Sequence, residues 1–147
     1  MNRKIMKKPH LIFWISIPVL ILNGILNSNK MLDINIQDTY YVFSKTALII
    51  VISSLLAIMG LGYYLTLKSK GKLSKWLNLI HVALTIGGML TVFILTQLFR
   101  ESIMEYKFNN NLTMAIYIMA IITIFAQILY PINLIGALIK TRNKTTG

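Results

Sequence analysis

Four long runs of apolar residues divide the chain, and each can cross the roughly 30 Å hydrocarbon core of a bilayer as a helix. The runs cover residues 11–27, 46–67, 77–98 and 113–139. No alternating pattern of apolar and polar residues suggests a membrane β-barrel. Because backbone groups in lipid must find their hydrogen bonds inside the protein, the runs predict an all-α fold, a four-helix membrane bundle forming a single domain over residues 1–147.

The composition agrees with a membrane location. Hydrophobic residues make up 56% of the chain, which is more than a soluble domain of this length carries. The 15 lysines and arginines exceed the 4 acids, but they lie in short clusters between the apolar runs, so membrane topology explains them better than nucleic acid does. The absence of cysteine excludes disulfides, thiolate metal sites and a cysteine nucleophile.

The first apolar run is the shortest and follows the basic start MNRKIMKKPH, so a cleaved signal peptide is an alternative to a retained helix. The residues that follow it, LNSNKMLD, contain no small-x-small cleavage site. The sequence therefore favours a retained first helix.

The charges predict the orientation of the helices. Basic residues precede the first run, fill the connection over residues 68–76 and close the chain, whereas all four acids lie in the other two connections. By the positive-inside rule, both termini and the 68–76 connection face the cytoplasm, as in a bacterial inner membrane. A basic inner connection can also attract anionic lipid, although topology is the favoured explanation. The acids are Asp33, Asp38, Glu101 and Glu105, and the inner bases include Lys68, Lys70, Lys72 and Lys75.

Small residues recur along one face of two of the predicted helices. They fall at offsets of four and seven, which places them in one stripe where another helix can approach closely. Gly87 lies beside the second stripe. The stripes are Ser53, Ala57 and Gly60 in the second run, and His81, Thr85 and Gly88 in the third.

Polar residues inside the runs have two interpretations. His81 could ligate a haem or a metal, but no second ligand lies at a suitable spacing, so a hydrogen bond between helices is favoured. Gln127, Tyr130 and Asn133 recur every three residues around Pro131, which removes a backbone donor. We expect them to bond freed carbonyls and neighbouring helices.

No catalytic constellation emerges from these residues. The acids all lie in connections, and His10 and His81 are far apart in the chain. The sequence holds no HExxH motif and no phosphate-binding glycine loop. We therefore assign no catalytic residue.

One segment resembles a known family. LDINIQDTYYVFSK and the run after it resemble the tenth helix of haem-copper oxidase subunit I, whose pattern runs close to L-D-I-x-x-H-D-T-Y-Y-V-x-x-H-x-H. The start of the family's eleventh helix is similar to Ile80 and His81. Its twelfth helix is similar to the segment with Ala126, Gln127 and Asn133, and its ninth helix is weakly similar to residues 9–31. The resemblance implies that the chain corresponds to the last four helices of an oxidase subunit I, in the same order. The residues that match the motif are Leu32, Asp33, Ile34, Asp38, Thr39, Tyr40, Tyr41 and Val42.

The departures from the family pattern change what the resemblance implies. The family's two haem-ligating histidines after the motif correspond here to Lys45 and Ala47. Alanine has no donor atom, and a lysine must lose its proton to bind a metal. The family's cation-associated His-Asp pair appears as Gln37 and Asp38, so Asp38 is only a weak metal candidate. The family's copper ligands belong to helices that precede these four.

These observations predict a truncated, catalytically inactive relative of subunit I, a structural or accessory component that binds no cofactor. Its partners would be the lipid bilayer and either a second copy or another membrane subunit. One alternative is a haem- or quinone-binding electron-transfer component of a respiratory complex. A small channel or transporter is a further alternative, but no acid or base lies inside any run.

Overall fold

The computed structural model describes residues 8–26, 31–36, 39–100 and 105–142. Within them, four helices are long and apolar enough to cross a membrane, at Pro9–Leu26, Lys45–Lys68, Lys75–Gln97 and Tyr106–Lys140. The predicted integral membrane protein with four helical spans is confirmed. The fourth span begins at residue 106, well before the predicted residue 113.

The chain forms two compact units, which we describe separately. The N-terminal unit is Lys8–Leu65. The C-terminal unit contains Thr66–Gly147.

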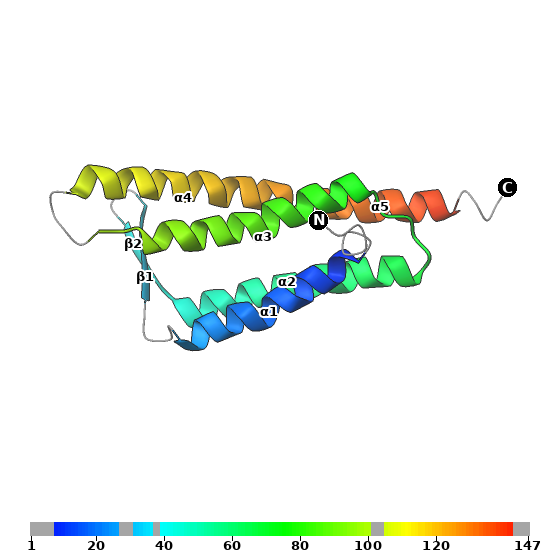
Figure 1. Ribbon diagram of the computed structural model, residues 1–147, viewed down its shortest axis with the longest axis horizontal. Helices are drawn as coiled ribbons and strands as arrows, with labels where there is room; N and C mark the ends of the chain where they lie inside the picture. The colour runs from blue at the N-terminus through cyan, green and yellow to red at the C-terminus, as the bar shows by residue number, and fades with distance from the viewer. Residues whose placement is uncertain (1–7, 27–30, 37–38, 101–104, 143–147) are drawn as a thin grey trace. The chain divides into compact units, whose positions relative to one another are not determined.

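In the N-terminal unit, two helices flank a β-hairpin (Figure 1). Helix α1 spans Pro9–Leu26, and its first residue is a proline, which suits that position because it has no N–H to leave unpaired. Strands β1, Met31–Ile36, and β2, Thr39–Ser44, are antiparallel, with Ile36 opposite Thr39. Helix α2, Lys45–Lys68, begins directly after β2.

The hairpin was not predicted from the sequence, because residues 28–45 lie between two apolar runs and were expected to form only an outer connection. The helical class holds for the four spans, and the hairpin adds a short sheet between the first two. β-Branched and aromatic residues dominate TYYVFS, and apolar residues alternate with polar ones in LDINI, as in a strand. The signal was present, but it was too short to stand out beside the apolar runs.

The C-terminal unit consists of three helices. Helix α3 spans Lys75–Gln97, α4 spans Tyr106–Ala126 and α5 spans Leu129–Arg142. Helix α3 lies beside α4, and α5 continues the path of α4 past the start of α3 (Figure 1). The predicted fourth run is thus interrupted at residues 127–128.

A tight turn precedes α3. The amide of Gly71 donates to the Thr66 carbonyl at 2.9 Å and that of Lys70 to the Leu67 carbonyl at 3.1 Å, which is the Schellman pattern at the end of a helix. Lys70 has a φ of 59°, a left-handed conformation that glycine adopts more easily. A Cβ on Gly71 would lie 2.8 Å from the Thr66 carbonyl oxygen. The turn therefore requires a glycine at position 71.

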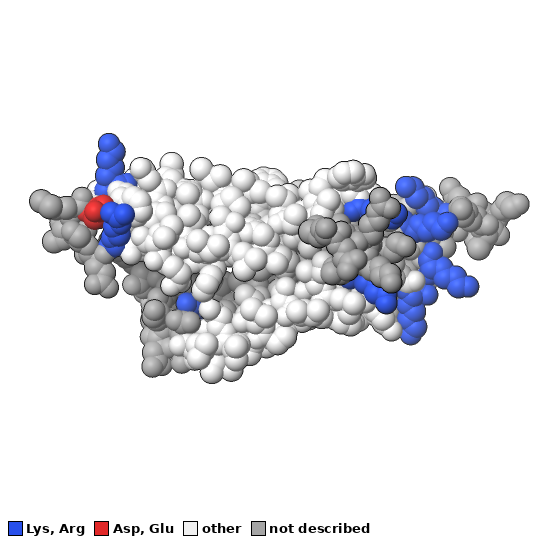
Figure 2. All heavy atoms as spheres, in the orientation of Figure 1, with Lys and Arg blue, Asp and Glu red and all other residues white. Residues whose placement is uncertain are grey.

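The charges of the C-terminal unit lie at its two ends. Lysines gather where α3 begins and α5 ends, Arg100 and Glu105 lie at the opposite end, and an uncharged belt separates the two groups (Figure 2). Trp76 and Tyr106, at the starts of α3 and α4, are 74% and 76% exposed. Aromatic side chains favour the headgroup level of a bilayer, so these two positions fit the two faces of a membrane.

Candidate functional site

The side chain of Gln127 joins polar groups of two helices, α3 and α4, in the C-terminal unit. It is the residue at the end of α4, and its amide nitrogen donates to the Thr85 hydroxyl at 3.1 Å and to the Thr123 carbonyl at 2.7 Å. Its amide oxygen lies 3.1 Å from Nε2 of His81. His81 and Thr85 are fully buried. We call these four residues the Gln127 cluster.

The hydrogen bonds fix the orientation of the groups in this cluster. A backbone carbonyl can only accept, so the amide nitrogen of Gln127 must face Thr123 and its oxygen must face His81. An amide oxygen is also only an acceptor, and Nε2 of His81 therefore carries the proton in this bond. The histidine is a donor to Gln127, not a ligand with a free Nε2 lone pair.

The interruption between α4 and α5 explains why a glutamine stands at this place. The Gln127 amide bonds the Ile124 carbonyl at 3.0 Å, three residues back, and the Thr123 carbonyl accepts from the Gln127 side chain instead. Pro131 has no N–H for the Gln127 carbonyl, which accepts from Tyr130 at 3.2 Å. The glutamine side chain thus replaces a backbone donor at the break in the helix.

A second polar cluster surrounds Asn133 of α5. The Asn133 amide oxygen accepts from the Ser74 backbone amide at 2.9 Å, and its nitrogen donates to the Asn78 side-chain oxygen at 2.6 Å and to the Ser74 carbonyl at 3.4 Å. Asn78 and Asn133 are both buried. These bonds hold α5 against the first turn of α3.

The predicted stripe of α3 makes a close helix contact at its glycine, Gly88. A Cβ on Gly88 would fall on the Thr123 hydroxyl of α4 and lie 3.3 Å from the Thr123 Cβ. A Cβ on Gly87 would meet nothing within 4 Å. Gly88 is therefore the position where α3 and α4 approach closely, while Gly87 lies outside that contact.

The predicted stripe of α2 faces α1. A Cβ on Gly60 would fall on the indole of Trp14, and the rings of Phe13 and Tyr63 stack with centroids 5.8 Å apart. Ser53 is buried on the same face, whereas Ala57 is half-buried. The N-terminal unit is held by ring packing against a glycine.

The start of α1 completes this contact with a group of three rings. The ring centroids of His10, Trp14 and Tyr64 are 5.4 to 5.7 Å apart. His10 is buried, and its Nδ1 has no hydrogen-bond partner in the described residues. Its described ring neighbours are aromatic, which suits packing, and the described residues hold no metal-binding group of three or more histidines, cysteines or acids.

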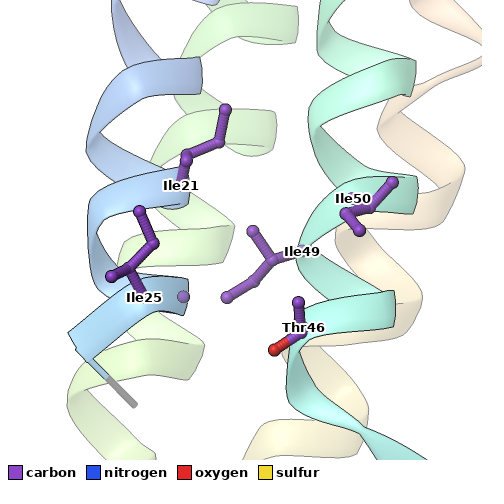
Figure 3. Close-up of a pocket in the computed structure, with 6 residues that line it drawn as sticks. Ile21, Ile25, Thr46, Ile49 and Ile50 are labelled. Atoms are coloured by element: carbon purple, nitrogen blue, oxygen red, sulfur yellow. The ribbon is translucent and has the colours of Figure 1, made fainter. Parts of the chain in front are cut away.

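An apolar groove lies between the other ends of α1 and α2. It has a volume of about 380 Å³, and Thr46 is the only polar residue that lines it. Ile21 and Ile25 face Ile49 across it (Figure 3). A Cβ on Gly24 would lie 3.0 Å from the end of the Ile49 side chain, so this glycine lets the two helices meet at the edge of the groove. The other two lining residues are Gly24 and Ile50.

The residues of the oxidase-like motif occupy the hairpin and the start of α2. Asp33 lies on β1, opposite Val42, and Thr39, Tyr40 and Tyr41 lie on β2. Gln37 and Asp38 lie outside the described residues. The structure thus places Thr39, Tyr40, Tyr41 and Val42 in a strand, within what the sequence predicted only as a connection between two apolar runs.

The positions that match the family's haem ligands do not fit a haem iron. Lys45 is the first residue of α2, and Ala47 is exposed in the first turn. Neither offers an imidazole, and no group of three or more histidine, cysteine or acidic residues with metal-binding geometry occurs in the part of the chain that the structure describes. We therefore derive no chemistry through a haem or a metal at this site.

The connection between α3 and α4 is tied by Asn109. Its side chain accepts from the Arg100 amide at 3.1 Å and donates to the Arg100 carbonyl at 2.7 Å. The Arg100 guanidinium bonds Glu105 at 2.8 Å and lies 4.3 Å from the centre of the Phe108 ring. These contacts bring the two helix ends together at the surface.

Sequence reasoning missed several residues that complete these contacts. Asn78 lies one turn before His81 on the same face of α3, so the spacing that identified His81 could have identified it. Nothing in the sequence paired Thr123 with Gly88, or Trp14 with Gly60, because such pairs depend on which helix faces which. The missed residues are Trp14, Gly24, Ser74, Asn78, Asn109 and Thr123.

No protein-family model, curated protein or solved structure matches this chain.

Proposed function

We propose that the chain is a structural or accessory membrane protein, a catalytically inactive relative of the last four helices of haem-copper oxidase subunit I. The observation that carries the proposal is the use of buried polar side chains in bonds between helices. Polar residues in a membrane interior often serve cofactors or transported ions. In the C-terminal unit, Gln127 and Asn133 instead tie α4 and α5 to α3.

The resemblance to the oxidase subunit supports the same function. The motif at residues 32–42 and the residues Ile80, His81, Gln127 and Asn133 follow one another as in the family. The departures at Lys45 and Ala47 argue against oxygen reduction, since that reaction needs the haem irons that histidines hold at these positions. A protein that keeps the helix contacts and loses the ligands is suited to assembly.

The proposal includes a protein partner that covers exposed apolar surface of the helices. Only 11% to 22% of each candidate span is buried within the chain, so most of the apolar surface must be covered by lipid or by other helices. We propose that a second copy or another membrane subunit of a respiratory complex covers part of it.

Purification of the tagged full chain in mild detergent tests the proposal. We expect light scattering to give a protein mass above the 16.7 kDa of one chain, or a defined membrane subunit to co-purify, with no Soret absorbance. A monodisperse monomer without a partner would contradict the accessory function. A stoichiometric Soret band, or quinone extracted from the same sample, would favour the electron-transfer alternative.

The orientation is a separate part of the proposal. We propose that both termini and the 68–76 connection face the cytoplasm of a bacterial inner membrane, because the lysines concentrate there. Ser44 and Lys70 are both exposed, so single cysteines at these positions can be labelled in a chain that has none. A membrane-impermeant maleimide applied to intact cells should label Ser44→Cys and spare Lys70→Cys. The reverse pattern would show the opposite orientation.

A further inference from the structure

The lysine-rich end of the C-terminal unit is the most strongly charged surface that the structure describes. Its lysines are exposed, and none of them has an ion-pair partner among the described residues. Glu105, the acid described in this unit, pairs with Arg100 at the opposite end. We call this surface the basic end, and it consists of Lys68, Lys70, Lys72, Lys75 and Lys140.

The basic end is built on a fixed scaffold. The two hydrogen bonds of the 66–71 turn set the path of the chain through Lys70, and Asn133 holds Ser74 against α5. Lys140 lies seven residues after Asn133 on the same helix, about 10 Å further along its axis. The lysines of the turn and of α5 therefore share one end of the unit (Figure 2).

Exposed apolar side chains adjoin these charges. Trp76, next to Lys75, is 74% exposed, and Ile139, next to Lys140, is 56% exposed. A ligand that satisfies both kinds of group must combine a negative charge with hydrocarbon. A soluble anion would satisfy only the lysines.

We propose that the basic end binds the phosphate headgroups of anionic phospholipids in the adjoining leaflet, with the Trp76 indole beside the headgroup. Lysine side chains gathered at one end of the unit repel one another, and bound phosphates reduce that repulsion. An anionic membrane surface attracts each nearby lysine by roughly the equivalent of a fivefold gain in binding. The inference does not depend on the relationship to oxidases.

Tryptophan quenching by brominated lipid tests this inference on the full chain. The protein has two tryptophans, so Trp14→Phe leaves Trp76 as the only one. The variant is reconstituted into vesicles that contain a small fraction of brominated phosphatidylglycerol or, in the matched sample, brominated phosphatidylcholine. Both leaflets carry the same lipids, so the orientation of the protein does not affect the result.

We expect brominated phosphatidylglycerol to associate with Trp76 at least about fivefold more strongly than brominated phosphatidylcholine. The preference should disappear in a variant with Lys70→Gln, Lys72→Gln and Lys75→Gln, and about 0.5 M salt should weaken it in the unsubstituted basic end. The matched control, Arg100→Gln with Lys107→Gln, removes charge from the other end and should keep the preference. Circular dichroism checks that each variant retains its helices.

Equal quenching by the two lipids would overturn the proposal, because the lysines would then serve only to orient the chain. An unchanged preference in the triple lysine variant would overturn it as well. The mass of the complex and its haem spectrum, which test the accessory function, are independent of both results.

Discussion

The two units hold their helices together in different ways. In the N-terminal unit, α1 and α2 meet through rings and a glycine, with Gly60 under Trp14 and Phe13 stacked on Tyr63. In the C-terminal unit, the Gln127 cluster and Asn133 join α3, α4 and α5 through side-chain hydrogen bonds. Both units contain a close approach at a glycine, Gly60 in one and Gly88 in the other, and the C-terminal unit adds side-chain donors and acceptors between its helices.

The difference follows from the solvent. Lipid tails are as apolar as leucine, so no hydrophobic force draws two membrane helices together, and they associate through packing or hydrogen bonds. α1 and α2 each continue without a break in the described residues, although Pro18 lies inside α1, and they meet at Gly60. The fourth span is broken at residues 127–128, and its freed backbone groups require polar side chains. The break therefore accounts for the glutamine of the Gln127 cluster.

Filling the glycine of the N-terminal contact should have the largest effect. Gly60→Leu places a side chain where the Trp14 indole lies, so either the indole must leave its contacts with His10 and Tyr64 or α1 must move away. We expect a loss of about 3 kcal/mol in the free energy of unfolding. The measurement is an SDS titration in mixed micelles that follows Trp14 fluorescence in a Trp76→Phe background.

Gly87→Leu is the matched control, since nothing lies within 4 Å of a Cβ at that position. It should change the free energy of unfolding by less than about 0.5 kcal/mol. If both leucine variants lost the same amount, the effect would belong to helical glycines in general, and the close contact of α1 with α2 would not explain it.

Substitution in the Gln127 cluster should lower the free energy of unfolding somewhat less than Gly60→Leu does. Gln127→Leu removes the bonds to His81, Thr85 and the Thr123 carbonyl. The two bonds to α3 contribute about 0.6 kcal/mol each, the average for hydrogen bonds between membrane helices. The third bond satisfies a freed carbonyl within α4 and contributes about as much, so we expect a total loss of about 2 kcal/mol. Circular dichroism during the same titration measures it.

Gln97→Leu makes the same substitution at an exposed residue at the end of α3 and should be nearly neutral. A double-mutant cycle with Thr85→Val sharpens the test. A coupling energy near zero would mean that the glutamine acts on its own helix break and not between helices.

The sequence predicted the helical spans because length and composition alone define them. The bounds of the third span, 77–98 against Lys75–Gln97, show how closely an apolar run follows a membrane helix. The break at residues 127–128 could be predicted only in part from the sequence. Pro131 marked it, but the hydropathy of the fourth run is continuous across it, so the run was assigned as one helix.

For each contact between helices, the sequence could predict one of the two partners. Gly60 and Gly88 could be identified as small residues in a stripe, because that needs only the helical period. Their partners, Trp14 and Thr123, could not, because partner choice depends on how helices pair across the whole chain. Gly87 was placed beside the stripe and not in it, and it makes no such contact, since one residue along a helix turns a side chain by about 100°.

A smaller effect is expected at the surface connection of the C-terminal unit. Asn109→Ala removes two hydrogen bonds with the Arg100 backbone, both exposed to solvent. We expect a loss of about 1 kcal/mol or less in the free energy of unfolding. Asn110→Ala is a matched control at the next, exposed position of α4. Equal losses in the two variants would mean that Asn109 does not tie the connection.

The smallest effect should come from the ion pair beside it. Glu105→Gln leaves an acceptor for Arg100 but removes the charge, and the guanidinium is 55% exposed at this position. Exposed pairs are worth about 0.2 to 1 kcal/mol, and the Phe108 ring, 4.3 Å away, continues to hold the guanidinium. We expect a loss below about 0.5 kcal/mol that disappears in about 0.5 M salt, because salt screens exposed charges. A loss that persists in high salt would mean that Glu105 acts through hydrogen bonding, and this end of the unit would then resemble the Gln127 cluster.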